Sequence, residues 1–229
     1  MRWATFDCYG TLVDWDHGIR ATLEELWPEA AADELLARYH EVEPRVQLNS
    51  GLPYREVLRE SLVLLAGHEG LELHPDREYA LAESLSSWPV FPEVPGSLGE
   101  LRERGWRLGV LSNTDPDLLS SSLAAIGVPF DIAITAAEAR SYKPAHGHWE
   151  RFGADTGAER ARHVHVGASP YHDLVPAAEL GLAAVWINRL DEESELPRAA
   201  ELPDLAGLAD VLDGLVPAGT LLERPARRW

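Results

Sequence analysis

The sequence predicts an α/β fold: a doubly wound parallel sheet, Rossmann-like, that is interrupted after its first strand by a helical insertion. Three observations carry this prediction. A short apolar run within residues 2–14 ends in an Asp-x-x-Gly-Thr motif, helical and strand patterns alternate from residue 94 onward, and residues 16–88 show helical periodicity with almost no β-branched runs. Alternating strands and helices imply a parallel sheet that is covered on both faces.

The first predicted strand ends in a carboxylate. It contains Trp3, Ala4, Thr5 and Phe6. Asp7 follows, and Gly10 permits a sharp exit of the chain. Open α/β sheets bind ligands at the carboxyl ends of their strands, so Asp7 is the first candidate for chemistry. The alternative is an aspartate that only closes a turn.

Residues 16–88 space their apolar side chains at intervals of three to four, which is typical of amphipathic helices. The predicted helices are Ile19–Trp27, Ala32–Glu43, Tyr54–Gly67 and Arg77–Trp88.

The remainder of the chain alternates between helix and strand. Helices are predicted near residues 95–105, 116–126, 145–157 and 173–180, and strands near 107–113, 130–135, 163–167 and 182–188. We therefore assign residues 1–15 and 89–217 to the α/β core, 16–88 to the helical insertion and 218–229 to a loosely held tail.

Composition narrows the function classes. The 229 residues include 20 basic and 38 acidic side chains, for a net charge of −18, which disfavours nucleic acid and anionic membranes as partners. A small anionic substrate would need a local cationic pocket. No apolar run approaches the roughly 18 residues that span a bilayer and no signal peptide precedes the first strand, so we expect a cytoplasmic protein. The single cysteine, Cys8, excludes an internal disulfide.

Lys143 is the only lysine of the chain, and every other basic residue is arginine. A lysine differs from an arginine in its compact charge and tunable pKa. It follows the strand predicted near residues 130–135, in the sequence Tyr-Lys-Pro. An isolated Lys-Pro is usually part of a surface loop, so its interest depends on the other strand ends.

Two further strand ends carry polar side chains. Ser112 and Asn113 follow the strand near residues 107–113, and Ser169, His172 and Asp173 follow the strand near 163–167. The carboxyl ends of parallel strands meet at one edge, so these side chains are expected near Asp7. A Ser-Asn pair is also a common helix cap.

Four strand-end segments have now been described, around Asp7, Ser112, Lys143 and Asp173. In this order they resemble the four motifs of the haloacid dehalogenase superfamily, and the resemblance covers nearly the whole chain. The resemblance implies that Asp7 is a nucleophile and that residues 16–88 form a cap domain. Phosphatases of the superfamily usually carry a second aspartate two residues after the first, where this chain has Tyr9. Asp7-Cys8-Tyr9-Gly10-Thr11 instead resembles the 2-haloacid dehalogenase branch, whose halide leaving group needs no proton.

The resemblance also implies roles for the other strand-end residues. Lys143 would hold the carboxylate of Asp7 ionised and in place. Asp173 is the first choice to activate the water that regenerates Asp7, and His172 is the alternative base.

Further residues would bind the substrate. Thr11, Ser112 and Asn113 would contact its carboxylate or the developing charge, with Ser169 nearby, and Tyr9 would exclude water. Arg38 lies 31 positions after Asp7, the separation at which haloacid dehalogenases place the arginine that binds substrate and halide. The alternative is that Arg38 lies on a solvated helix face and binds no ligand.

The chain departs from the family at several positions. Ala168 and Pro170 stand where dehalogenases carry Ser and Asn, and Trp149 stands where they carry Tyr. A Mg²⁺-dependent phosphatase of small phosphorylated metabolites is the alternative function, but Tyr9 and Ala168 remove two of its usual carboxylates. A noncatalytic binding protein is a third hypothesis, in which Asp7 and Lys143 would have no chemical purpose.

The expected partner is therefore a small anionic molecule, with no nucleic acid and no membrane. No cofactor and no metal are expected, and Mg²⁺ enters only if the phosphatase alternative holds. A homodimer through the cap is expected by analogy with the family alone.

Overall fold

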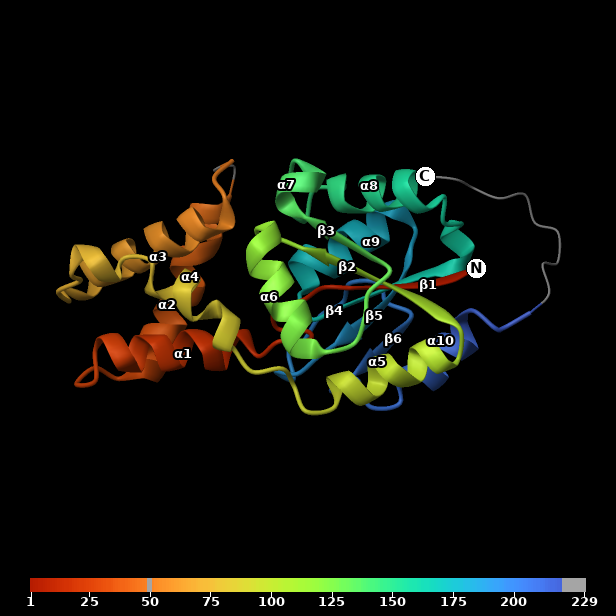
Figure 1. The fold of residues 1–229 in the computed structure, drawn as a ribbon, viewed down its shortest axis with the longest axis horizontal. Helices are drawn as coiled ribbons and strands as arrows, with labels where there is room; N and C mark the ends of the chain where they lie inside the picture. The colour runs from red at the N-terminus through yellow and green to blue at the C-terminus, as the bar shows by residue number, and fades with distance from the viewer. Residues whose placement is uncertain (49–50, 220–229) are drawn as a thin grey trace.

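The computed structural model describes residues 1–48 and 51–219. Its centre is one sheet of six parallel strands in the order β3-β2-β1-β4-β5-β6, which confirms the predicted α/β class (Figure 1). The strands are β1 (Arg2–Phe6), β2 (Trp106–Ser112), β3 (Ile132–Thr135), β4 (His163–Gly167), β5 (Ala183–Ile187) and β6 (Ala200–Leu202). The succession of strands reverses between β1 and β4, the place where open α/β sheets bind ligands.

Strand register brings the ends of β1, β2 and β4 together. Phe6 of β1 pairs with Val110 of β2 on one side and with Val166 of β4 on the other. The segments that follow these three strands therefore leave the sheet at one edge.

Side chains of β1 alternate between two hydrophobic cores, one on each face of the sheet. Ala4 and Phe6 belong to one core and Trp3 to the other. The first core is covered by α5 (Val94–Glu103), α6 (Pro116–Ile126) and α10 (Leu208–Leu215), and the second by α8 (Gly147–Thr156) and α9 (Val175–Leu180). The sheet is thus covered on both faces, as the sequence predicts.

Between β1 and α5 the chain is helical, and its helices lie beside the sheet, at the left of Figure 1. They are α1 (Trp15–Leu26), α2 (Ala32–Gln47), α3 (Tyr54–Glu69) and α4 (Ala80–Ser84). We call residues 15–87 the helical segment. The domain boundaries assigned from the sequence remain predictions.

The predicted helix Arg77–Trp88 is wrong. The structure has a 3₁₀ turn at Pro75–Arg77, the short α4, and a second 3₁₀ turn at Leu85–Ser87. Serine hydroxyls compete with the helical hydrogen bonds here, because Ser84 Oγ donates to the carbonyl of Leu81 at 3.1 Å and Ser87 Oγ donates to the carbonyl of Ser84 at 2.6 Å.

Two connecting segments, residues 12–14 and 89–91, join the helical segment to the sheet. They are hydrogen-bonded to each other. The amide of Asp14 donates to the carbonyl of Pro89 at 2.8 Å, and the amide of Phe91 donates to the carbonyl of Leu12 at 3.1 Å. Val13 and Val90 form an antiparallel bridge between them. We call this pair of segments the paired link.

The structure also adds elements that the sequence analysis missed. The short helix α7 (Ala136–Ala139), the edge strand β6 and the helix α10 have no predicted counterpart, and the helix predicted near 173–180 begins with a π-type turn at Pro170–Leu174. β6 has three residues on the sheet edge, too few for an alternating pattern. Most of the tail predicted at 218–229 lies outside the described residues.

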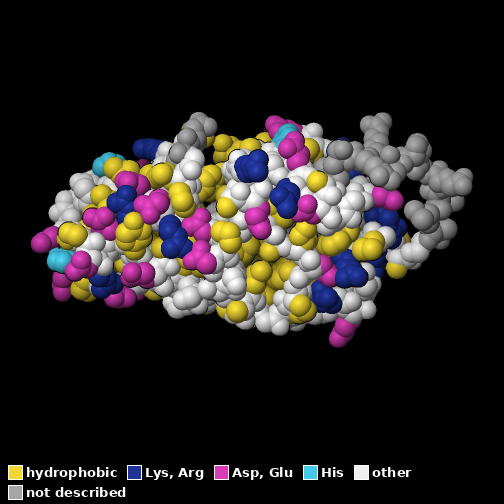
Figure 2. All heavy atoms as spheres, turned by 45° about the horizontal axis from the view of Figure 1, so that its top comes forward, with side chains coloured by type: hydrophobic (Ala, Val, Ile, Leu, Met, Phe, Trp, Pro, Cys, Tyr) yellow, Lys and Arg dark blue, Asp and Glu magenta, His cyan; other side chains and the backbone are white. Residues whose placement is uncertain are grey.

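Charges of both signs are mixed on the surface of the helical segment. At the left of Figure 2, arginine side chains lie among aspartate and glutamate side chains. Arg59, for example, pairs with Glu56 at 2.9 Å and with Glu78 at 3.0 Å. Within the described part of the chain, no helix is both long enough and apolar enough to cross a membrane.

Candidate active site

Asp7 lies directly after β1, at the edge where the strand ends meet. Its backbone amide donates to the carbonyl of Val166 at 2.9 Å, which continues the pairing of β1 with β4. Gly10 then turns the chain with a φ of 85°, a conformation that side-chain-bearing residues rarely adopt. This turn places Thr11 beside Asp7, and Thr11 Oγ1 donates to Asp7 Oδ2 at 2.9 Å.

Lys143 joins two carboxylates. It lies between α7 and α8, its side chain is 1% exposed, and Nζ donates to Asp7 Oδ1 at 2.7 Å and to Asp173 Oδ1 at 2.7 Å. The only lysine of the chain is therefore at the centre of the strand-end cluster, where the sequence analysis expected it.

Asp173 is buried on the π-type turn that follows β4. Ser169 donates its backbone amide to Oδ2 at 3.1 Å, and His165 Nε2 contacts Oδ1 at 3.1 Å. Gly167 permits this packing, because a Cβ at that position would lie 2.3 Å from Asp173 Oδ2. A side chain at Gly167 would displace the carboxylate.

Burial and the shared ammonium set the charges of this cluster. Burial raises the pKa of Asp7, and the charge of Asp173 adds to the rise, while Lys143 and Thr11 oppose it. Burial alone would also raise the pKa of Asp173, but Lys143 and His165 outweigh it and hold that pKa below its ordinary value. Burial would lower the pKa of Lys143, and the two carboxylates raise it instead, so Lys143 stays an ammonium.

The residues predicted to bind substrate have different environments. Thr11 uses its hydroxyl on Asp7 and on the amide of Ala168, which donates to it at 2.9 Å. Asn113 pairs with the main chain of Lys143: its Oδ1 accepts the Lys143 amide at 2.6 Å and its Nδ2 donates to the Lys143 carbonyl at 3.0 Å. Thr11 and Asn113 therefore position Asp7 and Lys143. Ser112 Oγ is buried and has no hydrogen-bond partner among the described residues, so it is available to a ligand.

Tyr9, Ser169 and His172 also line the cavity in front of Asp7. Burial raises the pKa of Tyr9, so its hydroxyl stays protonated, and it lies 3.0 Å from Ser122 Oγ. Ser169 Oγ accepts the amide of His172 at 3.1 Å and so caps the turn that carries Asp173. Burial, with repulsion from the nearby ammonium, lowers the pKa of His172 to about 4, so its ring is neutral at pH 7.

Arg38 does not reach this site. It is on α2, but its side chain is 59% exposed and pairs with Glu41 at 3.3 Å and with Glu69 at 3.8 Å. In this structure Arg38 therefore lies on a solvated helix face and does not line the cavity in front of Asp7. Helix phase is the reason: α2 buries Leu35 and Tyr39, and Arg38 is turned away from that stripe.

A cavity of about 930 Å³ lies between the sheet edge and the helical segment. On the sheet side it is lined by Asp7, Lys143, Ser112 and Asn113. Residues of α1 and α2 form the opposite wall, among them Trp15, His40, Glu43 and Gln47. Burial raises the pKa of Glu43 to about 7, and Gln47 Nε2 donates to its Oε1 at 3.0 Å.

The described arginines that line this cavity are all paired within the protein. Arg20 pairs with Glu24 at 2.7 Å and with Asp33 at 2.6 Å, and Arg189 pairs with Glu93 at 2.6 Å. A bound anion would therefore meet the ammonium of Lys143 and neutral donors such as the hydroxyl of Ser112.

Sequence reasoning missed Arg189 and His165. Arg189 Nη2 donates to the carbonyl of Thr11 at 2.8 Å and so supports the turn after Asp7. It directly follows the strand predicted near 182–188, so the search of strand ends could have found it. His165 lies within β4. The alternating sequence His-Val-His-Val of this strand does not show whether its histidines make buried polar contacts or lie on an exposed face.

The surroundings do not fit a hard divalent cation. Ala168 offers only main-chain atoms, and Lys143 Nζ lies between the carboxylates of Asp7 and Asp173. In residues 1–48 and 51–219, no group of three or more His, Cys, Asp or Glu side chains is arranged to hold a metal ion.

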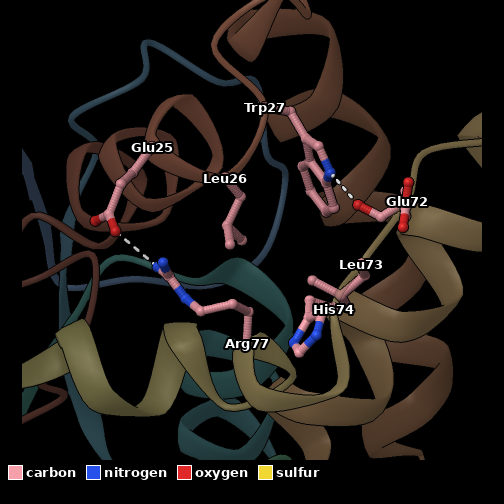
Figure 3. A pocket seen from close by; sticks show the side chains of 7 residues that line it. All are labelled: Glu25, Leu26, Trp27, Glu72, Leu73, His74 and Arg77. Carbon is pink, nitrogen blue, oxygen red and sulfur yellow. Dashed lines mark hydrogen bonds and ion pairs between the residues drawn. The ribbon is translucent and has the colours of Figure 1, made fainter.

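A smaller cavity of about 250 Å³ lies within the helical segment (Figure 3). Its arginine, Arg77, pairs with Glu25 at 2.7 Å, and the indole of Trp27 donates to the carbonyl of Glu72 at 2.9 Å. None of the strand-end residues lines it. The larger cavity is therefore the candidate active site.

Comparison with known proteins places this arrangement in context. The model of a haloacid dehalogenase-like hydrolase family matches residues 1–181. The chain is 28% identical to the (S)-2-haloacid dehalogenase of Pseudomonas sp. (strain YL), over 80% of this chain and 81% of that enzyme. It is 30% identical to the phosphoserine phosphatase of Thermus thermophilus, over 71% of this chain and 68% of that enzyme. The crystal structure of the L-2-haloacid dehalogenase RSc1362 superposes with a TM-score of 0.84 at 25% identity, over 93% of this chain and 99% of that one.

Proposed function

The chain belongs to the haloacid dehalogenase-like hydrolase family, and from this premise we propose that it hydrolyses the carbon–halogen bond of small 2-haloacids through an ester on Asp7. One observation carries the proposal: the ammonium of Lys143 lies between the carboxylates of Asp7 and Asp173 at 2.7 Å from each. A Mg²⁺-dependent enzyme would need further carboxylate ligands, and positions 9 and 168 carry Tyr and Ala instead.

In the first step a carboxylate oxygen of Asp7 attacks the halogen-bearing carbon. The new C–O bond forms as the carbon–halogen bond breaks, and the halide leaves with the bonding electrons. Thr11 and Lys143 each hold one oxygen of Asp7, which orients the nucleophile. Lys143 and the unpaired hydroxyl of Ser112 are donors that line the cavity with Asp7 and that a substrate carboxylate could use.

In the second step water attacks the ester carbonyl of Asp7. The C–O bond to Asp7 Cγ breaks, the 2-hydroxy acid leaves, and the carboxylate returns with net release of one proton. Asp173 is the first choice to orient this water, because it is held beside Asp7 through Lys143. His172 remains the alternative base, since it lines the cavity and is neutral at pH 7.

Halide release is the direct test. The enzyme is expected to release halide from 2-chloropropionate at the same rate with and without excess EDTA, because positions 9 and 168 supply no carboxylate for a divalent cation. Halide is measured by ion chromatography and proton release by pH-stat. A chain inert on haloacids but active on phosphate esters with added Mg²⁺ would reverse the proposal.

That second candidate, a Mg²⁺-dependent phosphatase of small phosphorylated metabolites, is favoured by the similarity to the Thermus thermophilus phosphoserine phosphatase. Against it stand Tyr9, whose raised pKa makes it a poor acid, and Ala168, which has no side-chain oxygen.

Isotope labelling tests the covalent step. In a single turnover in H₂¹⁸O with enzyme in excess, ¹⁸O is expected in the protein and not in the hydroxy acid, because the product takes its oxygen from Asp7. Peptide and product masses report the label. Label in the product of the first turnover would mean that water attacks the substrate carbon and that Asp7 is only a base.

Arg38→Ala is expected to change kcat/KM for 2-chloropropionate by less than about twofold, because exposed ion pairs contribute little. Steady-state kinetics at two salt concentrations would check this. A loss of more than tenfold would restore Arg38 to the substrate site and would require the helical segment to move in the bound state.

The proposal extends to the setting of the enzyme. We place it in the cytoplasm, acting on a small anionic molecule without a cofactor, and as a homodimer through the helical segment. Sedimentation equilibrium of the purified protein tests the assembly.

A further inference from the structure

A chain of buried hydrogen bonds lies behind Asp173, on the far side from the cavity. His163 Nε2 is 2.7 Å from Thr5 Oγ1, Thr5 Oγ1 is 3.0 Å from His165 Nδ1, and His165 Nε2 is 3.1 Å from Asp173 Oδ1. The strand register creates this chain, because Thr5 of β1 pairs directly with His165 of β4. All four side chains are at most 1% exposed. The two catalytic steps described above do not use His163, His165 or Thr5.

The carboxylate at one end fixes the direction of one contact. Asp173 can only accept, so His165 Nε2 carries the hydrogen of that contact. Thr5 Oγ1 lies 3.0 Å from His165 Nδ1 and 2.7 Å from His163 Nε2, so it holds the second nitrogen of the His165 ring. Burial and the neighbouring imidazole lower the pKa of His163, which keeps its ring neutral. Thr5 thereby fixes the orientation in which His165 Nε2 donates to Asp173.

His165 completes the support of the Asp173 carboxylate. Oδ2 accepts the Ser169 amide, and Oδ1 accepts from Lys143 and His165. Lys143 is shared with Asp7, and its attraction to Asp7 weakens when that carboxylate becomes a neutral ester. Thr5 and His165 contact no group that changes charge at Asp7, so they hold Asp173 in the same way before and after the ester forms.

We propose that His165, held by Thr5, is a positioning residue for the second step, in which it keeps Asp173 aligned with the water that hydrolyses the ester. This inference rests on the proposed function. Thr11 and Lys143 are the groups that hold Asp7 for the first step, and neither is hydrogen-bonded to Thr5 or His165. Loss of the chain should therefore slow ester hydrolysis and leave ester formation unchanged.

Thr5→Val is the test variant, because it removes one hydroxyl and keeps the shape of the side chain. With 2-chloropropionate in rapid quench, the rate of the first halide burst is expected to stay within about twofold of wild type. The steady-state rate is expected to fall at least about tenfold, since misplacement of an oriented group by an ångström can cost about 100-fold. Intact-protein mass during turnover should show accumulation of the ester. Thr5→Ser, which keeps the hydroxyl, should restore both values.

Thr22→Val is the matched control. Thr22 is also a buried threonine, but it lies in α1 and its hydroxyl donates to the carbonyl of Gly18 at 3.0 Å. It should lose stability without any change in the fraction of ester. If Thr5→Val does not fold, His165→Leu takes its place, with His165→Gln as the variant that keeps an N–H donor.

Several results would overturn the inference. An unchanged ester fraction in Thr5→Val, equal slowing of burst and steady state, or a Thr5→Ser variant that behaves like Thr5→Val would each reduce His165 to a packing residue. These results require a wild-type enzyme that releases halide. A wild type that releases none would instead contradict the proposed function, and the inference with it.

Discussion

Replacement of Asp7 by asparagine is expected to abolish turnover, with kcat lower by about four orders of magnitude or more, because the other carboxylate of the cluster, Asp173, is fully buried and bonded to Lys143, His165 and Ser169. Halide release from 2-chloropropionate, followed over hours at high enzyme concentration, measures the residual rate.

The same substitution should leave the fold intact. The buried cluster contains two carboxylates, Asp7 and Asp173, and one ammonium, Lys143. Removing the charge of Asp7 leaves one carboxylate with one ammonium and relieves repulsion between the two acids. Thermal unfolding is therefore expected at the wild-type temperature or slightly above it. A folded Asp7→Asn enzyme with more than about one per cent of wild-type activity would contradict the assignment of the nucleophile.

Lys143→Ala is expected to lower kcat by at least about two orders of magnitude, the usual cost of removing a preorganised electrostatic partner. It should also destabilise the protein, because it leaves Asp7 and Asp173 buried without a cation. One of the two would then take up a proton, and the pH optimum should shift upward. Lys143→Arg should also fail, since a planar guanidinium does not fit where a compact ammonium bridges two oxygens at 2.7 Å.

Amine labelling gives a measurement that does not depend on the stability of a variant. Lys143 is the only ε-amine of the chain, so reagents selective for amines can modify that side chain and the N-terminus alone. Because Lys143 is buried and its pKa is raised, we expect it to be labelled much more slowly in the native enzyme than in the unfolded chain. Near-normal turnover in Lys143→Ala, or native labelling of Lys143 as fast as in the unfolded chain, would remove Lys143 from the site.

The strand-end residues could be predicted because their position depends on local rules. Apolar runs that end in Asp7, Ser112 and the Gly167 segment are visible in the sequence, and parallel strands bring their carboxyl ends to one edge. What each side chain contacts there is a tertiary property. Asn113 lies at the predicted strand end, but its side-chain amide is hydrogen-bonded to the main chain of Lys143. The spacing of residues along the sequence could not reveal this contact.

Arg38 shows the limit of counting along the chain. A separation of 31 residues from Asp7 identifies the helix but not the face on which the residue lies. One residue corresponds to about 100° of rotation on a helix, so Arg38 and Tyr39 point in different directions. The burial of Leu35 and Tyr39 gives the phase of α2, and that stripe is present in the sequence.

The paired link has a consequence for how substrate enters. Two segments that are hydrogen-bonded through Asp14, Pro89 and Phe91 resist stretching and twisting as a unit, whereas a single tether would not. The helical segment is also held at a second place, because Asp115, directly before α6, accepts the backbone amides of Tyr54 and Arg55 at 2.9 and 3.0 Å. Asp7 lies on one wall of the cavity and Glu43 on the other. To widen the cavity for substrate or product, the protein therefore has to bend the link or break the contacts of Asp115.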